Sequence, residues 1–290
     1  MVNFTDMFTG ATRWERAQVL DPAVAKVRGW VRAVPLGQRT RDVLHGVPLG
    51  HALHPALVQL PIGAWMSAAA LDLSRRPEHS DAARRLVGLG VLAAAPAAVA
   101  GWVDWAEQHQ PQLRVGLVHA STNGLAISLY AASYLARRAG RGPLGRVLAM
   151  AGLTAVSLGG MIGGHLVSRQ ASGVNHAEEV PYVVPGGWQD LGPLADLAED
   201  RPERRMLGET ALLVVRHGEQ ASVLAGRCSH LSGPLPDGEL DVADGCVTCP
   251  WHGSTFRLAD GAVVSGPAIA PQPVFQTRVV DGRLEVRLPE

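Results

Sequence analysis

Four long apolar segments in the first half of the chain limit its possible folds more than any other feature. They cover residues 55–74, 86–105, 115–136 and 146–168, and the charged residues between them are confined to short breaks. Each segment reaches the roughly 20 residues that a helix needs to cross a bilayer. Buried helices of a soluble all-α protein are the alternative, but four such segments in a row would overfill a soluble core. We therefore expect a four-helix transmembrane bundle over residues 51–169.

The chain before the bundle, residues 1–50, is expected to form a basic amphipathic tail. Within residues 21–34, Val24, Val27 and Val31 share one face of a helix, and basic residues lie on the other sides. Such a helix can lie on an anionic membrane surface or pack against its own protein, and the pattern leaves both open. The first residues lack the continuous apolar stretch of a signal peptide, so internal helices are expected to drive membrane insertion.

The second half of the chain has the pattern of a different domain. Residues 170–187 are expected to form a linker that contains prolines and a glycine pair. Over residues 188–290, short runs with strand character alternate with turn signals such as Asp260-Gly261 and Asp281-Gly282. This pattern predicts a small antiparallel β domain. The expected fold class is therefore multidomain, with an all-α four-helix transmembrane bundle followed by a small all-β domain.

Charge and cysteine content argue against two functional classes. The chain has 26 basic and 26 acidic residues, and this balance argues against a general nucleic-acid-binding role. Its three cysteines, Cys228, Cys246 and Cys249, are clustered and odd in number, unlike a secreted disulfide framework. The clustering favours metal ligation instead.

A motif of alternating cysteines and histidines carries the strongest chemical signal. Cys228-Ser229-His230 is followed, after 18 residues, by Cys249-Pro250-Trp251-His252. The motif supplies two thiolates and two imidazoles from two loops. Two cysteines and two histidines are also a zinc-binding set, but zinc fingers usually pair like ligands along the sequence. The alternating order therefore favours another kind of metal centre over zinc.

This motif resembles that of the Rieske [2Fe–2S] family, and the resemblance extends from Trp188 to the end of the chain. His252-Gly253-Ser254, and the stretch from Gly266-Pro267 to Pro271-Gln272-Pro273, also resemble that family's cluster-covering loops. The resemblance implies that the small all-β domain is a Rieske iron–sulfur domain with a [2Fe–2S] cluster as its cofactor.

By this resemblance, Cys228 and Cys249 hold one iron of the cluster, and His230 and His252 hold the other. Neutral imidazoles in place of two thiolates raise the reduction potential above that of a four-cysteine ferredoxin. Both imidazoles are expected to reach the surface, where they offer a short path for electrons.

Departures from the family pattern point to one branch of it. Rieske proteins of quinol-oxidising cytochrome complexes carry an extra cysteine in each loop, joined as a disulfide, whereas this chain has Leu231-Ser232-Gly233 and Trp251 there. Phe256 stands where those proteins have a hydrogen-bonding tyrosine. Fewer donors to the cluster lower its potential, so we expect a domain closer to Rieske-type ferredoxins. The third cysteine, Cys246, is expected to be a buried strand thiol.

Histidines within membrane spans are rare and call for an explanation. His54 opens the first expected helix, His119 lies near the start of the third, and His165 lies near the end of the fourth. In a four-pass bundle these ends share one membrane surface, so we expect the histidines to cluster there with Asp104, and with Asn123 one turn after His119. The cluster is a candidate site for a b-type haem, a quinone or another metal. Histidines that only bridge helix ends by hydrogen bonds are the alternative.

Residues 40–170 also resemble a multi-pass membrane protein family of unassigned function. The resemblance is carried by His45-Gly46, Gly50-His51, His54-Pro55, Pro61-Ile62-Gly63 and Asp72, and by Asp104, His119 and the glycine-rich end of the fourth helix. It implies a membrane domain and names no activity.

These features predict a multi-pass cell-membrane protein that carries single electrons between a redox protein partner and a haem b or quinone in its bundle. The sequence shows no nucleotide-binding glycine loop and no large domain for a mononuclear iron, so we assign no catalytic residue and leave open whether the chain is an enzyme. The alternatives are a membrane oxidoreductase subunit acting on quinol or a small molecule, and a redox sensor or assembly protein. Arginines in the loops after the first and third helices favour a C-terminal domain outside the cell. The lack of an export signal favours a C-terminal domain inside it. The sequence therefore leaves the side of the membrane open.

Overall fold

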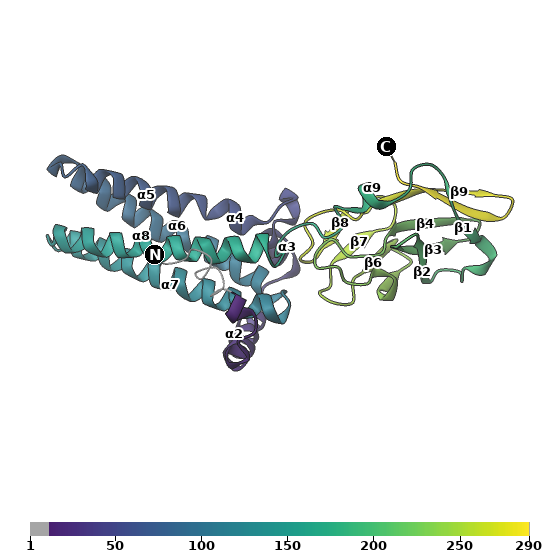
Figure 1. Ribbon diagram of the computed structural model, residues 1–290, viewed down its shortest axis with the longest axis horizontal. Coiled ribbons are helices and arrows are strands. Elements are labelled where there is room, and N and C mark those ends of the chain that lie inside the picture. The colour runs from purple at the N-terminus through teal and green to yellow at the C-terminus, as the bar shows by residue number, and fades with distance from the viewer. Residues whose placement is uncertain (1–11, 290) are drawn as a thin grey trace, which may run out of the picture. The chain divides into compact units, whose positions relative to one another are not determined.

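The computed structural model describes residues 12–289 and divides them into two units. One unit contains residues 12–35 and 53–172 and is helical, whereas the other contains residues 36–52 and 173–289 and holds the strands (Figure 1). The domain boundaries expected from the sequence, at residues 50, 169 and 187, stay a prediction.

Long helices make up most of the helical unit. They are α5 (Gln59–Leu73), α6 (Ser80–Ala106), α7 (Gln110–Arg138) and α8 (Gly142–Ser168), and the short α4 (Leu53–Leu57) leads into α5. Three of the four expected apolar segments therefore lie within one helix each, and the first, residues 55–74, spans α4 and α5. Among the described residues, three helical stretches are long and apolar enough to cross a membrane by length and composition: Leu53–Leu73, Pro77–Ala106 and Gly142–Ser168. The fourth helix, α7, has the length, but its first half carries polar side chains, and its crossing stays a prediction.

Aromatic rings set against glycines hold these helices close together. Trp65 of α5 stacks on Tyr130 of α7, with ring centroids 4.1 Å apart and planes 7° apart. A Cβ at Gly90 of α6 would collide with the Trp65 ring, and one at Gly152 of α8 would lie 2.9 Å from the Tyr130 ring. Small residues let helix backbones approach closely where apolar burial alone gives little specificity.

A buried ion pair joins α7 to α5. The Arg137 guanidinium donates two hydrogen bonds to the Asp72 carboxylate, at 2.9 Å and 2.5 Å, and the two side chains are only 3% and 9% exposed. Ser133, one turn before Arg137, donates its hydroxyl to the Gly145 carbonyl of α8 at 2.6 Å. A buried charge is tolerated only when it is paired and hydrogen-bonded, so these contacts constrain the relative positions of three helices.

The expected amphipathic helix of the N-terminal tail is α2 (Asp21–Ala33), and it packs against its own protein. Val24 is buried in a cluster with Trp105 and Leu113. Arg114 of α7 donates to both oxygens of Asp21, at 2.6 Å and 2.8 Å. Of the two alternatives for this helix, the structure therefore shows packing on the bundle. The part of the expected tail before residue 12 lies outside the described residues.

The other unit is built from two antiparallel sheets, as the turn pattern predicted. The six-stranded sheet has the order β1-β10-β9-β4-β3-β2, and the four-stranded sheet has the order β5-β6-β7-β8. Their bounds are β1 (Gln189–Pro193), β2 (Pro202–Leu207), β3 (Thr210–His217), β4 (Gln220–Ala225), β5 (Glu239–Asp241), β6 (Cys246–Thr248), β7 (Thr255–Arg257), β8 (Val263–Ser265), β9 (Val274–Val280) and β10 (Arg283–Arg287), with a short helix α9 (Val180–Val183) before β1.

Strand β3 separates two cores in this unit. Successive side chains of a strand point to opposite faces, so Leu212 and Val214 enter one core while Leu213 and Val215 enter the other. The second core also contains Cys228, Cys249 and Phe256. Burial on both faces explains why this strand is a continuous apolar run in the sequence.

Residues 36–52, which precede the bundle in the chain, belong to the unit with the strands. They form helix α3 (Gln38–His45), which ends at Gly46 with a φ of 91°. The Asp42 carboxylate of this helix accepts a hydrogen bond from the Gly266 backbone N–H at 3.0 Å. The segment is therefore tied to the β domain, although the sequence analysis placed it in the N-terminal tail.

The buried ion pair leads to a stability prediction. Asp72→Ala should lower the free energy of unfolding by about 3–5 kcal/mol, because it leaves the Arg137 guanidinium buried without its carboxylate. Unfolding of the purified protein in detergent measures the change. Asp81→Ala is the control, since Asp81 pairs with Arg84 and Arg85 at the surface and its loss should have little effect. Equal losses in the two variants would contradict a structural role of the Asp72 pair.

Candidate metal centre

Two loops of the β unit bring the alternating cysteines and histidines together. The first loop follows β4 and carries Cys228 and His230, and the second joins β6 to β7 and carries Cys249 and His252 (Figure 1). In the first loop, the Cys228 N–H donates to the Gly233 carbonyl at 2.8 Å, and the Ser232 N–H donates to the Cys228 carbonyl at 2.9 Å. These bonds close a compact turn over the cysteine.

The second loop repeats this turn. The Cys249 N–H donates to the Ser254 carbonyl at 2.8 Å, and the Gly253 N–H donates to the Cys249 carbonyl at 3.1 Å. The residue four places after each cysteine has a left-handed backbone, with a φ of 61° at Ser232 and 74° at Gly253. The two cysteines are therefore presented by two copies of one hydrogen-bonded turn.

The two cysteine sulfurs are hydrogen-bonded to each other. The hydrogen bond with the Cys228 thiol lowers the pKa of Cys249 to about 6. The backbone N–H groups of Trp251 and His252 lower it further. The same thiol–thiol bond, together with burial, raises the pKa of Cys228. Thiolate is the form that binds metal, so the thiol–thiol contact and the backbone N–H groups favour the ligand form of Cys249.

Backbone N–H groups surround each sulfur at equivalent positions. The residues two and three places after Cys228, His230 and Leu231, donate to its sulfur and favour its thiolate. Trp251 and His252 occupy the same two places after Cys249. Hydrogen bonds to ligand sulfur stabilise negative charge and tune the reduction potential of an iron–sulfur centre.

The two imidazoles form a second pair beside the thiols. The rings of His230 and His252 have centroids 5.1 Å apart and planes 88° apart. His252 is partly exposed, as expected, but His230 is only 8% exposed, so the expectation that both rings reach the surface is wrong for His230. The chain that follows α8 covers this loop, because the His176 N–H donates to the Ser229 carbonyl at 2.9 Å.

A buried glutamine holds the first loop in place. Gln272 is 2% exposed, and its carbonyl oxygen accepts the Ser229 N–H at 3.1 Å while its amide nitrogen donates to the Ala225 carbonyl at 2.8 Å and to the Arg227 carbonyl. Sequence reasoning placed Gln272 in a cluster-covering stretch without giving it a role. A buried amide between two prolines was the available signal.

Two further contacts brace the second loop. The buried Ser254 hydroxyl accepts the Ala268 N–H at 3.0 Å. Gly266 lies against this loop so closely that a Cβ there would be 2.7 Å from the Gly253 carbonyl oxygen and from Cα of Ser254. Asp42 accepts the Gly266 N–H, as described above, and sequence reasoning missed it because no local pattern links residues so far apart.

The donor set suits two metal ions better than one. Thiol lies beside thiol and imidazole beside imidazole, so each pair can serve one iron of a two-iron cluster. Gly233 leaves room for the sulfur of the other loop, because a Cβ there would lie 2.6 Å from Cys249 Sγ. A structural zinc site instead gathers four donors around one ion. The third cysteine, Cys246, is buried in β6 with its thiol 3.3 Å from the Asp244 carbonyl, and burial raises its pKa.

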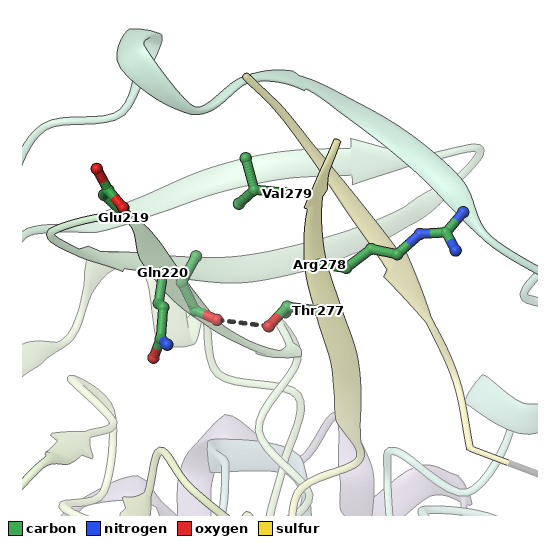
Figure 2. Close-up of a pocket in the computed structure, with 6 residues that line it drawn as sticks. Glu219, Gln220, Thr277, Arg278 and Val279 are labelled. Atoms are coloured by element: carbon green, nitrogen blue, oxygen red, sulfur yellow. Dashed lines mark hydrogen bonds between the residues drawn. The ribbon is translucent and has the colours of Figure 1, made fainter. Parts of the chain in front are cut away.

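A hollow elsewhere on the six-stranded sheet takes no part in this centre. It has a volume of about 400 Å³ and lies between the start of β4 and strand β9 (Figure 2). Its lining includes Glu219, Gln220 and Arg278, and the Thr277 hydroxyl donates to the Ala221 carbonyl at 3.0 Å. No residue of the two cysteine loops lines it.

Comparison with known proteins identifies the β unit. Residues 187–276 match the family described as Rieske [2Fe-2S] domain. The anthranilate 1,2-dioxygenase ferredoxin subunit of Burkholderia cepacia is 34% identical over 101 residues, which cover 35% of this chain and 92% of that protein. The chain belongs to the Rieske [2Fe–2S] family. A Rieske domain implies a [2Fe–2S] cluster, and it serves as a ferredoxin-type electron-transfer domain.

Two other relatives of the Rieske domain differ in how much of their length is matched. Ferredoxin CarAc of Metapseudomonas resinovorans is 32% identical over 80 residues, covering 28% of this chain and 73% of that protein. The cytochrome b6-f complex iron-sulfur subunit of Chlorobaculum tepidum is 26% identical over 98 residues, covering 34% of this chain and 52% of that protein. Residues 50–176 match the family described as predicted membrane protein (DUF2231), so the chain fuses a membrane protein domain to a Rieske domain.

The structure brings together only some of the polar residues expected to cluster in the bundle. His54 of α4 and His119 of α7 are adjacent, with ring centroids 6.3 Å apart. Asn123 donates to the His119 carbonyl at 2.9 Å, and its amide nitrogen lies 3.4 Å from the His119 ring. His165 of α8 instead contacts the Glu15 carboxylate at 2.7 Å, and Asp104 lies in the last turn of α6.

The repeated turn predicts opposite responses to substitution at its two left-handed positions. Gly253→Ala should lower the stability of the Rieske domain by about 1–2 kcal/mol, because a Cβ is disfavoured in that conformation. Ser232→Gly should leave stability unchanged or raise it, since glycine adopts the conformation freely. Thermal loss of the cluster's visible absorption measures both. A destabilised Ser232→Gly variant would show that the serine side chain, and not the backbone, supports the first loop.

Proposed function

We propose that this protein is a membrane-anchored electron carrier whose cluster is held by Cys228, Cys249, His230 and His252. The observation that supports it best is the repeated turn, which sets two thiols side by side and two imidazoles side by side. A [2Fe–2S] cluster bound there supplies one-electron redox chemistry. The backbone N–H groups beside each cysteine would stabilise the charge of its thiolate.

The partly exposed His252 supports electron exchange with a redox protein partner on that side of the centre. Phe256 in place of a hydrogen-bonding tyrosine leaves fewer donors near the cluster and favours a ferredoxin-like potential. The names of two relatives, a dioxygenase ferredoxin subunit and an iron–sulfur subunit of a cytochrome b6-f complex, fit a partner that accepts or donates single electrons. The apolar helices support a multi-pass anchor in the lipid bilayer of the cell membrane.

A second redox site in the bundle is the finer part of this proposal. Its candidate residues are His54, His119 and His165, with Asp104 and Asn123 nearby in the sequence pattern, and its ligand would be a haem b or a quinone. The adjacency of His54 and His119 supports such a site. It also keeps a membrane oxidoreductase subunit, acting on quinol or a small molecule, as the second candidate function.

Cysteine variants test the cluster ligands. Cys228→Ser and Cys249→Ser should each abolish the EPR signal of the reduced Rieske cluster, because each removes one of the two thiolates expected on one iron. His230→Ala and His252→Ala should abolish it as well. The EPR spectrum of dithionite-reduced full-length protein, with its iron content, measures the effect.

The chain offers a matched control for each ligand type. Cys246→Ser changes the third cysteine, and His217→Ala changes a half-exposed histidine of β3 that contacts Asp200. Both controls should retain the signal. A Rieske signal that survives in any of the four ligand variants would overturn the assignment of that residue.

A further inference from the structure

Two histidines from different helices approach each other inside the bundle. His54 of α4 and His119 of α7 are both half-buried, their ring centroids are 6.3 Å apart, and their planes are 81° apart. The two histidines are 65 positions apart in the sequence. Cofactor and metal sites in helix bundles are built from side chains on facing helices.

Hydrogen bonds to neighbouring helices settle which nitrogen each neutral ring presents. His54 Nδ1 lies 2.7 Å from the Ala97 carbonyl oxygen of α6, and His119 Nδ1 lies 2.9 Å from the Gly159 carbonyl oxygen of α8. A carbonyl oxygen can only accept, so Nδ1 carries the hydrogen in both rings. Each neutral imidazole therefore keeps its lone pair on Nε2, which is the arrangement of a metal-ligating histidine oriented by a backbone carbonyl.

Glycines on α6 and α8 make room for both rings. A Cβ at Gly101 would lie 2.8 Å from His54 Nδ1, and a Cβ at Gly163 would lie 3.1 Å from His119 Cε1. At Gly159 a Cβ would lie 2.6 Å from the Asn123 amide, which contacts His119. The helices around the pair are thus shaped to hold the imidazoles in one orientation.

The third histidine of the bundle is engaged differently. His165 Nε2 lies 2.7 Å from the Glu15 carboxylate, and its side chain is 8% exposed. Arg169 also approaches this carboxylate, at 3.5 Å. These contacts give His165 a structural role, in which it ties the segment before α2 to the end of α8.

We infer that His54 and His119 together would hold the iron of a haem. Two imidazoles that share one metal ion can have ring centroids roughly 6 Å apart, since each metal–nitrogen bond is about 2.0 Å and the nitrogen lies about 1 Å from its ring centre. The observed separation agrees with this spacing. A haem needs only two protein ligands because the porphyrin supplies the others, whereas a bare divalent ion usually takes more.

A quinone fits these tautomers less well. A quinone oxygen needs an N–H donor, and both Nδ1–H groups are committed to backbone carbonyls. The inference rests on the proposed function only in that the haem would be the second redox site named there. The contacts within the bundle support the choice of His54 and His119 without reference to the Rieske domain.

The test uses full-length protein produced with haem available and purified in detergent. The reduced-minus-oxidised visible spectrum and a pyridine haemochrome assay should show near-stoichiometric b-type haem. His54→Gln and His119→Gln should each lose most of it, because glutamine can still donate to the carbonyl but is a poor iron ligand. His79→Gln is the matched control and should retain the haem, because His79 lies in the turn before α6 and contacts Ser74. All three variants should keep the reduced Rieske EPR signal.

The possible failures are distinct. Wild-type protein with a full Rieske signal and no haem would overturn the inference and leave the electron-carrier function standing, and co-purified quinone in that sample would identify the other ligand. Haem retained in the His54→Gln, His119→Gln double variant would overturn the ligand pair. A wild-type sample without the Rieske signal would instead contradict the proposed function. If a glutamine variant unfolds, recovery of the haem band in His119→Gly by added imidazole supports the pair, and no recovery overturns it.

Discussion

Two copies of one hydrogen-bonded turn underlie the metal centre of this protein. Each turn begins at a cysteine, is closed by two backbone hydrogen bonds, and aims N–H groups at the cysteine sulfur. Strands β4, β6 and β7 fix where the turns begin, and the amide of Gln272 and the hydroxyl of Ser254 fix how they sit on the sheets. The backbone therefore sets the positions from which the candidate ligand side chains extend.

The pairing of like ligands divides the centre into two electrostatic halves. The thiol pair is buried, so negative charge on that side depends on backbone N–H groups for stabilisation. Imidazoles bring no negative charge to the other side, and His252 is partly exposed there. Because the thiols are buried and His252 is partly exposed, we propose that a redox partner docks beside His252.

The helical unit follows a different physical logic. In lipid, the hydrophobic effect contributes little to the association of helices. The bundle is instead held together by aromatic side chains that pack against glycines and by the buried Arg137–Asp72 ion pair. The same use of glycine recurs around His54 and His119, where it frees space for imidazoles instead of aromatic rings. Glycines therefore make room both for the aromatic rings that pack the helices and for the histidine pair, and only the side chain that fills the space differs.

The sequence by itself determined the two-part architecture, the apolar helices, the small β domain and the alternating Cys/His motif. Hydropathy, turn dipeptides and ligand spacing are local patterns, and each is visible within a few tens of residues. Only the tertiary structure decided which distant residues meet. It tied Asp42 to Gly266, assigned Gln272 to the first loop, buried His230, and separated the His54–His119 pair from His165 and Glu15. These contacts join elements that are far apart in the chain. Their geometry depends on how the elements pack, and packing produces no periodic pattern that could be recognised in the sequence.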